Sequence, residues 1–257
     1  MKKFLSLFLA VTLIAFCCLC GGCTNDKGDL ATDEQLEAFF ADKQGLADVV
    51  TYKIKGKSDY GVQKSKYSGY CVCYEGARFA TKYKSRLFAL PSPTTGMSLF
   101  EIMKEKGVAV CEDGSYNKYV DLKRFNFIAM ASKKYKLAEP VIFQAIDVQY
   151  YLTHYILAIR QKGWTSLPDA QGEVSYEVYI KGESCTLVAT DVANGEVAAV
   201  RAITVTYKNG EFKSLSYNHH GIAYRIDEEI EIKVCKEKKI ALPDNPDEYK
   251  GTITDAQ

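Results

Sequence analysis

The residues in this sequence that carry the most chemistry are its cysteines and its three histidines. Cys71 and Cys73 are two residues apart, so on a strand their sulfur atoms share one face, about 6.6–6.8 Å apart and at the far limit for a disulfide. As metal ligands they would need two further partners. His219 and His220 are adjacent, so on a strand they point to opposite faces and away from a common ion. We therefore predict a buried pair of thiols and no metal site.

The sequence also holds few candidates for catalytic residues. His154 is expected on a helix surface, and three histidines give a Ser-His-Asp set little to draw on. The sequence holds no glycine-rich phosphate loop and no CxxC redox motif. The acidic run from Asp227 to Glu231 offers weak calcium ligands, although a solvated strand or turn is the favoured interpretation. The prediction is a protein with no cofactor, no catalytic residues and no enzymatic activity.

The N-terminus has the pattern of an export signal. Met1-Lys2-Lys3 is positively charged, Phe4–Phe16 is apolar, and Gly21 and Gly22 precede Cys23. The apolar run is too short to span a bilayer, which takes about twenty residues. This arrangement resembles the bacterial lipoprotein signal, from which it departs at Cys20, where that family usually has Leu.

The resemblance implies that residues 1–22 are removed and that Cys23 carries the lipid, with palmitate among its acyl chains. Residues 23–31 would then be the lipidated cysteine and a flexible polar tether. The protein would lie at the extracytoplasmic face of the cell membrane, held there by the anchor. The alternative is an ordinary secretory signal in which the cysteines are apolar filler.

Composition indicates a folded domain without affinity for nucleic acid. Removing residues 1–22 leaves 235 of the 257 residues, and it removes two of the 33 basic residues and none of the 32 acidic ones, for a net charge of −1. A near-neutral chain gives no reason to expect a nucleic-acid partner. The hydrophobic fraction of 47% supports a real core. Five cysteines follow Cys23, and an odd number leaves their disulfide pairing open: Cys71, Cys73, Cys111, Cys185 and Cys235.

The first third of the domain predicts a helix and three strands. Thr32 and Gln35 have the spacing of a capping box that opens a helix over 33–43. From Val49 to Leu87 apolar and basic residues alternate in three runs, which predicts three antiparallel strands with one apolar and one basic face. Residues 51–90 include nine basic residues and only two acidic ones. The candidate basic surface is Lys53, Lys55, Lys82, Lys84 and Arg86.

The rest of the chain predicts more strands and two helices. Ser98 and Glu101 form a second capping-box spacing, which predicts a helix that stops before Gly107. Strands are expected over 108–111 and 119–122, and a long, nearly all-apolar helix over 141–162, ended by Gly163. Asn194-Gly195 and Asn209-Gly210 predict hairpin turns among the later strands. Residues 32–243 would form one domain, and 244–257 a loose polar tail.

These elements predict a mainly β (α+β) fold: a large curved antiparallel sheet or half-barrel with a leading helix and a buried mid-chain helix. Their order across residues 30–243 resembles the LolA/LppX-like lipoprotein carriers. The segment Lys239–Tyr249 (KIALPDNPDEY) also resembles the Ile-x-x-Pro ending of the anchored members. The resemblance implies a half-barrel whose hollow face takes up lipid, and it supplies no binding residues by position.

The expected function is therefore to bind or carry an apolar or amphipathic ligand at the cell envelope, without catalysis. Eighteen tyrosines suit such a face, because each ring is apolar and ends in a hydroxyl. The alternative is a structural or interaction lipoprotein with no ligand cavity, which docks an envelope partner or an anionic surface through its sheet face. An envelope hydrolase would need a nucleophile–base pair, and the sequence shows none.

The anchor gives the first testable prediction. Cys23→Ala should release the protein from membranes, because the only residue expected to carry the acyl chains is lost. Fractionation of cells followed by immunoblotting measures the membrane-bound share. Cys20→Ala is the matched control and should leave the protein membrane-bound. Membrane retention of the Cys23→Ala variant would show that the anchor lies elsewhere.

Overall fold

The computed structural model describes residues 28–45, 50–61, 63–74, 78–89, 100–112, 115–124, 148–164, 170–222 and 226–240. The predicted signal 1–22, Cys23, the tail 244–257 and the first part of the predicted 141–162 helix lie outside these residues. Neither described helix is long and apolar enough to cross a bilayer.

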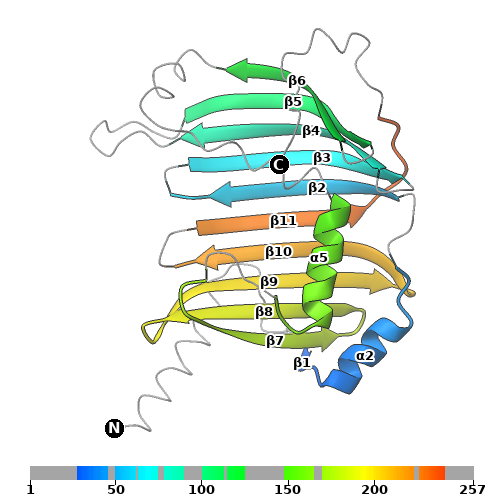
Figure 1. Cartoon of the computed structure of the whole chain (residues 1–257), viewed down its shortest axis with the longest axis vertical. Coiled ribbons are helices and arrows are strands. Elements are labelled where there is room, and N and C mark those ends of the chain that lie inside the picture. Colours follow the sequence, from blue (N-terminus) through cyan, green and yellow to red (C-terminus); the bar gives the residue numbers. More distant parts are fainter. Residues whose placement is uncertain are drawn as a thin grey trace.

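One antiparallel sheet of eleven strands organises the molecule, in the order β1-β7-β8-β9-β10-β11-β2-β3-β4-β5-β6 (Figure 1). The chain builds two blocks of sequential strands, and the pairing of β11 with β2 joins them. The sheet does not close into a barrel. The strands are β1 (Asp29–Leu30), β2 (Val50–Asp59), β3 (Gln63–Tyr74), β4 (Arg78–Ala89), β5 (Phe100–Glu112), β6 (Ser115–Arg124), β7 (Glu173–Lys181), β8 (Ser184–Ala193), β9 (Glu196–Lys208), β10 (Glu211–Gly221) and β11 (Ile226–Val234).

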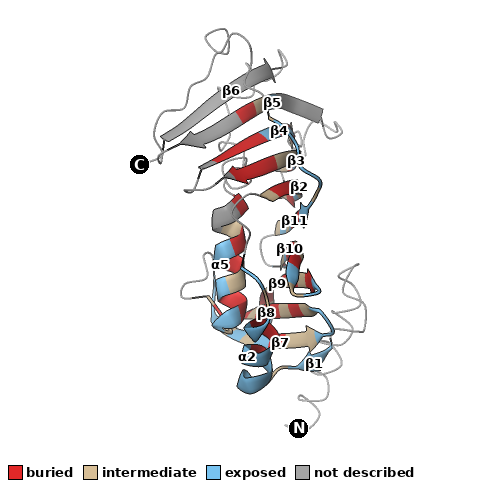
Figure 2. Ribbon diagram, turned by 90° about the vertical axis from the view of Figure 1, so that its right-hand side faces the viewer, coloured by how far each residue is buried: buried red, intermediate tan, exposed pale blue. Residues whose placement is uncertain are grey.

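The sheet is curved, and its two described helices lie on the concave face, which buries the core (Figure 2). Helix α5 (Val148–Arg160) crosses the strands and packs mainly on β8 and β9, with Leu152 and Ile159 fully buried. Its outer face is exposed, and Leu157 keeps 46% of its surface in solvent. The predicted mainly β curved sheet is therefore confirmed. The described part of the mid-chain helix is buried on one side rather than all round.

Helix α2 (Asp33–Ala41) follows its sequence signals closely. Thr32 and Gln35 form the predicted capping box: the Gln35 amide nitrogen donates to Thr32 Oγ1 at 3.2 Å, and the Thr32 amide nitrogen donates to Gln35 Oε1 at 2.9 Å. Phe39 and Phe40 are buried and meet the ring of Tyr207 on β9 edge-on, at centroid distances of 6.0 and 6.2 Å. The helix is thereby fixed over one end of the concave face.

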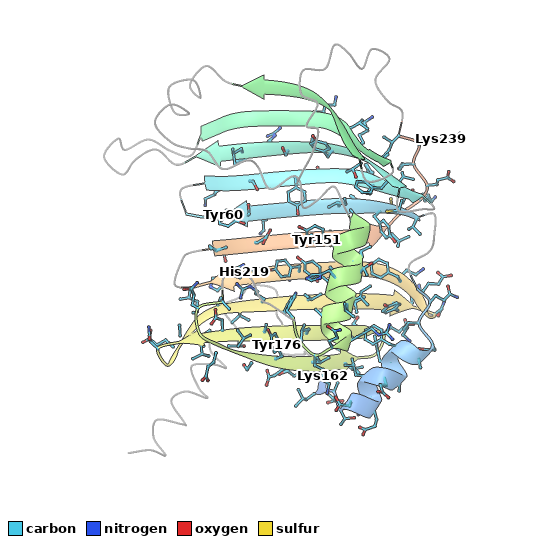
Figure 3. All side chains as sticks on the ribbon, viewed as in Figure 1. Tyr60, Tyr151, Lys162, Tyr176, His219 and Lys239 are labelled. Carbon is cyan, nitrogen blue, oxygen red and sulfur yellow. The ribbon has the colours of Figure 1, made fainter. Side chains whose placement is uncertain are left out.

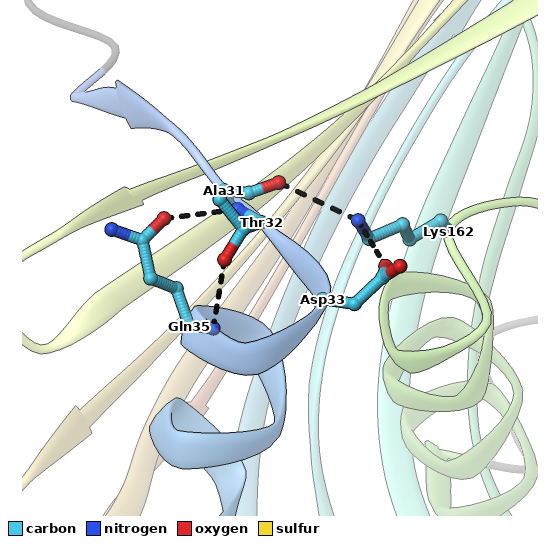
Figure 4. Close-up of polar contacts among 5 residues, drawn as sticks. All are labelled: Ala31, Thr32, Asp33, Gln35 and Lys162. Carbon is cyan, nitrogen blue, oxygen red and sulfur yellow. Dashed lines mark hydrogen bonds and ion pairs between the residues drawn. The ribbon is translucent and has the colours of Figure 1, made fainter.

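The end of α5 is tied to the start of α2. Lys162 has a φ of 54° and Gly163 donates to the Ala158 carbonyl at 2.9 Å, so the helix closes with the left-handed residue at Lys162, one position before the predicted stop. The Lys162 Nζ then donates to the Ala31 carbonyl at 3.4 Å and pairs with Asp33 at 2.5 Å (Figure 4). One lysine thus connects the C-terminus of one helix to the N-terminus of the other.

Two sequence predictions are wrong. The helix predicted to begin at Ser98 and stop before Gly107 is instead the first half of β5, which pairs with β4 on one side and β6 on the other. A capping-box spacing is a local signal, and pairing on both edges of the strand overrides it. The predicted tether over 23–31 is also too long, because Asp29 and Leu30 pair with Ile180 and Tyr179 of β7.

The hairpin predictions are confirmed. Asn194 and Asn209 have φ values of 54° and 53°, and the glycine after each has a φ of 81° and 79°, the positive values that a tight two-residue turn requires. The second turn pairs Lys208 with Glu211 and Tyr207 with Phe212, as the sequence predicts. Beyond this pair the register shifts by one residue at Lys213.

Candidate functional site on the concave face

A row of polar side chains crosses the concave face at one end of the strands. The register places Arg201 of β9 opposite His219 of β10, and His219 opposite Glu228 of β11. Glu228 lies opposite Ser58 of β2, and Ser58 opposite Ser65 of β3. Figure 3 shows His219 and the nearby Tyr60 toward the same end of the sheet. We call these five residues the polar row: Ser58, Ser65, Arg201, His219 and Glu228.

The concave face becomes apolar along the strands, away from the polar row. The next row contains Ile203, Tyr217, Ile230, Gly56 and Tyr67, and the one after it Val205, Leu215, Ile232, Ile54 and Gly69. Further along, β2, β3 and β4 contribute buried apolar or weakly polar side chains, namely Tyr52, Cys71, Cys73, Phe79 and Thr81. The face is thus amphipathic along the strand direction.

Three tyrosines surround the middle of the polar row. The rings of Tyr155 on α5 and Tyr217 on β10 are stacked, with centroids 5.1 Å apart and planes 15° apart. Tyr217 is hydrogen-bonded to Arg201, and Glu228 lies close enough to Tyr67, Tyr155 and Tyr217 to disfavour ionisation of each phenol. A carboxyl, a guanidinium and three phenols therefore converge where α5 meets the centre of the sheet.

Tyr67 is held in this cluster by a glycine. A Cβ atom at Gly56, its partner on β2, would lie 1.9 Å from Tyr67 Cζ, so the ring lies directly over a position where only glycine fits. The Tyr67 side chain is 7% exposed. Among the residues that the structure describes, its Oη finds no hydrogen-bond partner. A buried hydroxyl without a partner costs free energy, which a bound polar group would recover.

Burial sets the protonation of the cluster. It raises the pKa of Glu228, and the nearby Arg201 only partly opposes this shift. Burial also raises the pKa values of Tyr67, Tyr155 and Tyr217. The three phenols consequently stay protonated near neutral pH and act as hydrogen-bond donors. No hydrogen bond or ion pair in the described part of the chain engages the Glu228 carboxyl.

The far end of the polar row is closed. Asp191 is buried and accepts hydrogen bonds from the amide nitrogens of Gln171 and Gly172, at 2.8 and 3.0 Å. This contact holds the chain before β7 across the end of the sheet. It leaves a pocket of about 10 Å³ beside Arg201 and His219, which is close to the smallest space that holds one water molecule. A ligand therefore does not fit beyond Arg201, on the side away from Tyr217.

The polar row lacks the geometry of a nucleophilic site. The Ser58 and Ser65 hydroxyl oxygens are 2.7 Å apart and hydrogen-bond to each other. Among the described residues, neither hydroxyl bonds to an imidazole or a carboxylate that could take its proton. What the arrangement can do is bind: it offers a fixed positive charge, several hydroxyl donors and one titratable carboxyl.

The two adjacent histidines point to opposite faces. His219 lies on the concave face, whereas His220 pairs with Asp227 on the convex face. The acidic run lies in β11, and its side chains alternate between the two faces of the sheet. Glu229 and Glu231 point to the convex face, where they pair with Lys57 and Lys233. Within the described part of the chain, no group of three or more His, Cys, Asp or Glu side chains is placed to hold a metal ion. His154 is exposed on α5.

Cys71, Cys73 and Cys185 are thiols in the core, and Cys235 is partly buried. Cys71 and Cys73 are fully buried and unbridged, with their sulfur atoms 3.9 Å apart, closer than the separation predicted from strand rise, because the two side chains lean toward each other. Cys185 and Cys235 are also unbridged, and burial raises the pKa of the Cys185 thiol to about 12. The side chain of Cys111 lies outside the described residues. These buried thiols behave as small apolar side chains.

The predicted basic residues are brought together on the convex face. Lys53 and Lys82 flank Tyr70, Lys55 and Lys84 flank Ser68, and Arg86 lies opposite Lys66. All five predicted residues are exposed. Like charges meet directly at Lys57–Lys66, Lys66–Arg86 and Lys84–Lys106. Such pairs are destabilising, so an anionic partner on this face would relieve them.

Sequence reasoning missed the roles of Arg201, Glu228 and Tyr67. The Asn209-Gly210 turn alone predicts that Arg201 lies opposite Asn218, and the bulge at Lys213 moves its partner to His219. The same shift turns His219 rather than His220 inward. Pairing between β11 and β2 joins segments far apart in the sequence, and no local signal predicts it.

Compared with protein-family models and with curated proteins, the chain matches none.

The raised pKa of Glu228 predicts a pH-dependent stability. In the unfolded chain this carboxyl loses its proton near its ordinary pKa of about 4.3, while the folded protein retains the proton to higher pH. The stabilisation from protonated Glu228 is fully present below that value and is lost as pH rises through the folded pKa. Relative to Glu228→Gln, the wild type should therefore lose stability as pH rises from about 4.3.

Urea unfolding at a series of pH values measures this difference. Glu229→Gln, which removes an exposed carboxyl from the opposite face of the same strand, controls for the loss of one charge. If the free energies of unfolding of the wild type and of Glu228→Gln change with pH in the same way, the raised pKa of Glu228 would be contradicted.

Proposed function

We propose that this protein is a lipid-anchored, non-catalytic lipoprotein of the cell envelope that binds or carries an apolar or amphipathic ligand on the concave face of its sheet. One observation carries the proposal: the concave face is amphipathic along its strands, polar at the polar row and apolar beyond it. The resemblance of the chain to the lipoprotein signal and to the lipoprotein carriers supports the anchor and the carrier role.

The ligand would lie against β2, β3 and β4. Helix α5 packs mainly on β8 and β9, and the pocket beside Arg201 has room for one water molecule only. The apolar face continues over Ile54, Tyr83 and Leu87. These side chains are buried in the folded chain, so a ligand must replace existing packing to reach them. We therefore expect uptake to be slow and to depend on shape and apolar area rather than on an open groove.

Native mass spectrometry of the full chain, before and after exposure to an envelope lipid extract, tests the carrier proposal. We expect a discrete added mass that organic solvent removes. Leu87→Ser on the concave face should weaken uptake, whereas Leu157→Ser on the exposed side of α5 should not, and circular dichroism checks that both variants fold. A clean unliganded mass after exposure would rule out this role.

A second function has an observation of its own, the like-charge pairs on the convex face. This face would rest against the anionic membrane surface to which the anchor holds the protein. Each lysine near such a surface contributes about 1 kcal/mol, which salt weakens. The face would then orient the domain rather than bind the ligand.

Reversing Lys82 and Lys84 to Glu should strongly reduce co-sedimentation of the protein with vesicles that contain anionic phospholipid. A double reversal of Lys181 and Lys208 gives the same change in net charge at exposed positions in β7 and at the end of β9. It should leave sedimentation nearly unchanged. Equal effects of the two double variants would show that net charge, and not this face, governs binding.

A further inference from the structure

We infer that the ligand of the concave face is an amphiphile with an acidic head, a carboxylate or a phosphate, which is received by Arg201, Tyr67 and Glu228 while its apolar tail runs along β2, β3 and β4. This inference rests on the proposed carrier function and names the class of ligand. It follows from the position, the charge and the hydrogen-bonding capacity of the polar row.

Arg201 provides the positive charge that would bind an acidic head. Arg201 is 3% exposed, and its guanidinium is a fixed positive charge with hydrogen-bond donors only. It is oriented by its hydrogen bond with Tyr217, whose ring is fixed in turn by stacking on Tyr155 of α5. A planar guanidinium held in this way matches the two oxygen atoms of a carboxylate or phosphate. A cationic head would be repelled.

Hydroxyl donors lie within electrostatic range of Glu228, between Arg201 and β3. Tyr67 brings a buried Oη that no described residue engages, at the step from the polar row to the apolar rows. Tyr155 and Tyr217 are protonated phenols beside it. Donors outnumber acceptors here, so the complementary head is rich in acceptor oxygens. A long-chain alcohol would satisfy fewer of these donors and would leave the Arg201 charge without a counter-ion from the ligand.

Glu228 sets the charge of the site. The charged or titratable groups that face it are Arg201 on β9, His219 and Tyr217 on β10, Tyr67 on β3 and Tyr155 on α5. As a neutral acid, Glu228 donates a hydrogen bond to the ligand head. As a carboxylate, it competes with that head for Arg201. Glu228→Gln mimics the neutral acid and removes this competition.

The register places head and tail in one line. Ser58 and Ser65 continue the polar row on β2 and β3, and the positions below them on the same strands are Gly56 and Tyr67, then Ile54 and Gly69. The Tyr67 ring fills the space over Gly56, and at Gly69 the backbone of β4 comes so close that a Cβ atom would overlap it. A tail that leaves the polar row therefore meets aromatic rings and apolar side chains from its first carbon atoms.

The test compares oleate, 1-oleoyl-lysophosphatidate and oleyl alcohol, which share a tail and differ in the head. Their dissociation constants are measured on the full chain carrying Cys23→Ala. The acidic head should tighten binding at least about tenfold over the alcohol, the effect of one charge-assisted hydrogen bond. Whichever acid binds more tightly identifies the head as carboxylate or phosphate.

Two substitutions at the site should act in opposite directions. Arg201→Met should remove the preference for the acids, and Arg160→Met, at an exposed arginine of α5, is the matched control that should retain it. Because Arg201→Met removes a buried charge and could unfold the protein, Glu228→Gln provides a second measurement. It should tighten oleate binding at neutral pH and leave the alcohol unaffected.

Equal affinity for oleate and oleyl alcohol would overturn this inference and leave the carrier function standing. So would an acid preference that survives Arg201→Met in a folded protein, or oleate binding that Glu228→Gln weakens. Failure of all three probes to bind would count against the proposed function itself, and the inference would fall with it.

Discussion

The pairing of β11 with β2 is the constraint on which the rest of the structure depends. Residues from Asp227 to Val234 align with residues from Asp59 back to Tyr52, joining strands that are more than 160 positions apart in the sequence. Without this pair the chain would form two separate meanders, each with an exposed edge and half a core. With it, the concave face becomes continuous, and Glu228 lies beside Ser58 and within reach of Tyr67. Closing such a long loop is entropically costly, so the interface must bury apolar side chains, and Ile54, Ile230 and Ile232 are buried there.

The polar row places polar and charged side chains where a protein core normally has apolar ones. Apolar residues at these positions would be simpler to bury, since a buried charge is costly unless it is compensated. Part of the row is compensated inside the protein, through the contacts of Arg201 with Tyr217 and of Ser58 with Ser65. Among the described residues, the remainder comprises Glu228, the Tyr67 hydroxyl and one guanidinium nitrogen of Arg201. Uncompensated polarity that is concentrated in this way, at the boundary between a polar and an apolar surface, is typical of a binding site.

Much of the fold could be predicted from short-range patterns, because those patterns determine local geometry directly. Thr32 and Gln35 define a helix start, Asn209-Gly210 defines a turn, and the alternation of lysines in β2 and β4 separates two faces. The failures involve competition between local and long-range interactions. Ser98 and Glu101 have helical spacing, but a strand between two partners satisfies more backbone groups. The site was missed because one bulged residue, Lys213, decides which side chains of β10 face inward. A bulge of this kind leaves no distinctive residue type in the sequence.

The short pairing of β1 with β7 has a mechanical consequence. An anchor near the N-terminus would pull on the chain at Gly28. The force would act first on Asp29 and then on Leu30, so the hydrogen bonds between β1 and β7 would break one after the other. The next attachments along the chain are the Ala31 amide, which donates to the Val178 carbonyl of β7, and Lys162, which binds both Ala31 and Asp33. Tension that peels away β1 would therefore reach the end of α5, the helix that contributes Tyr155 to the tyrosine cluster. A membrane anchor at the N-terminus would therefore be connected mechanically to the concave face.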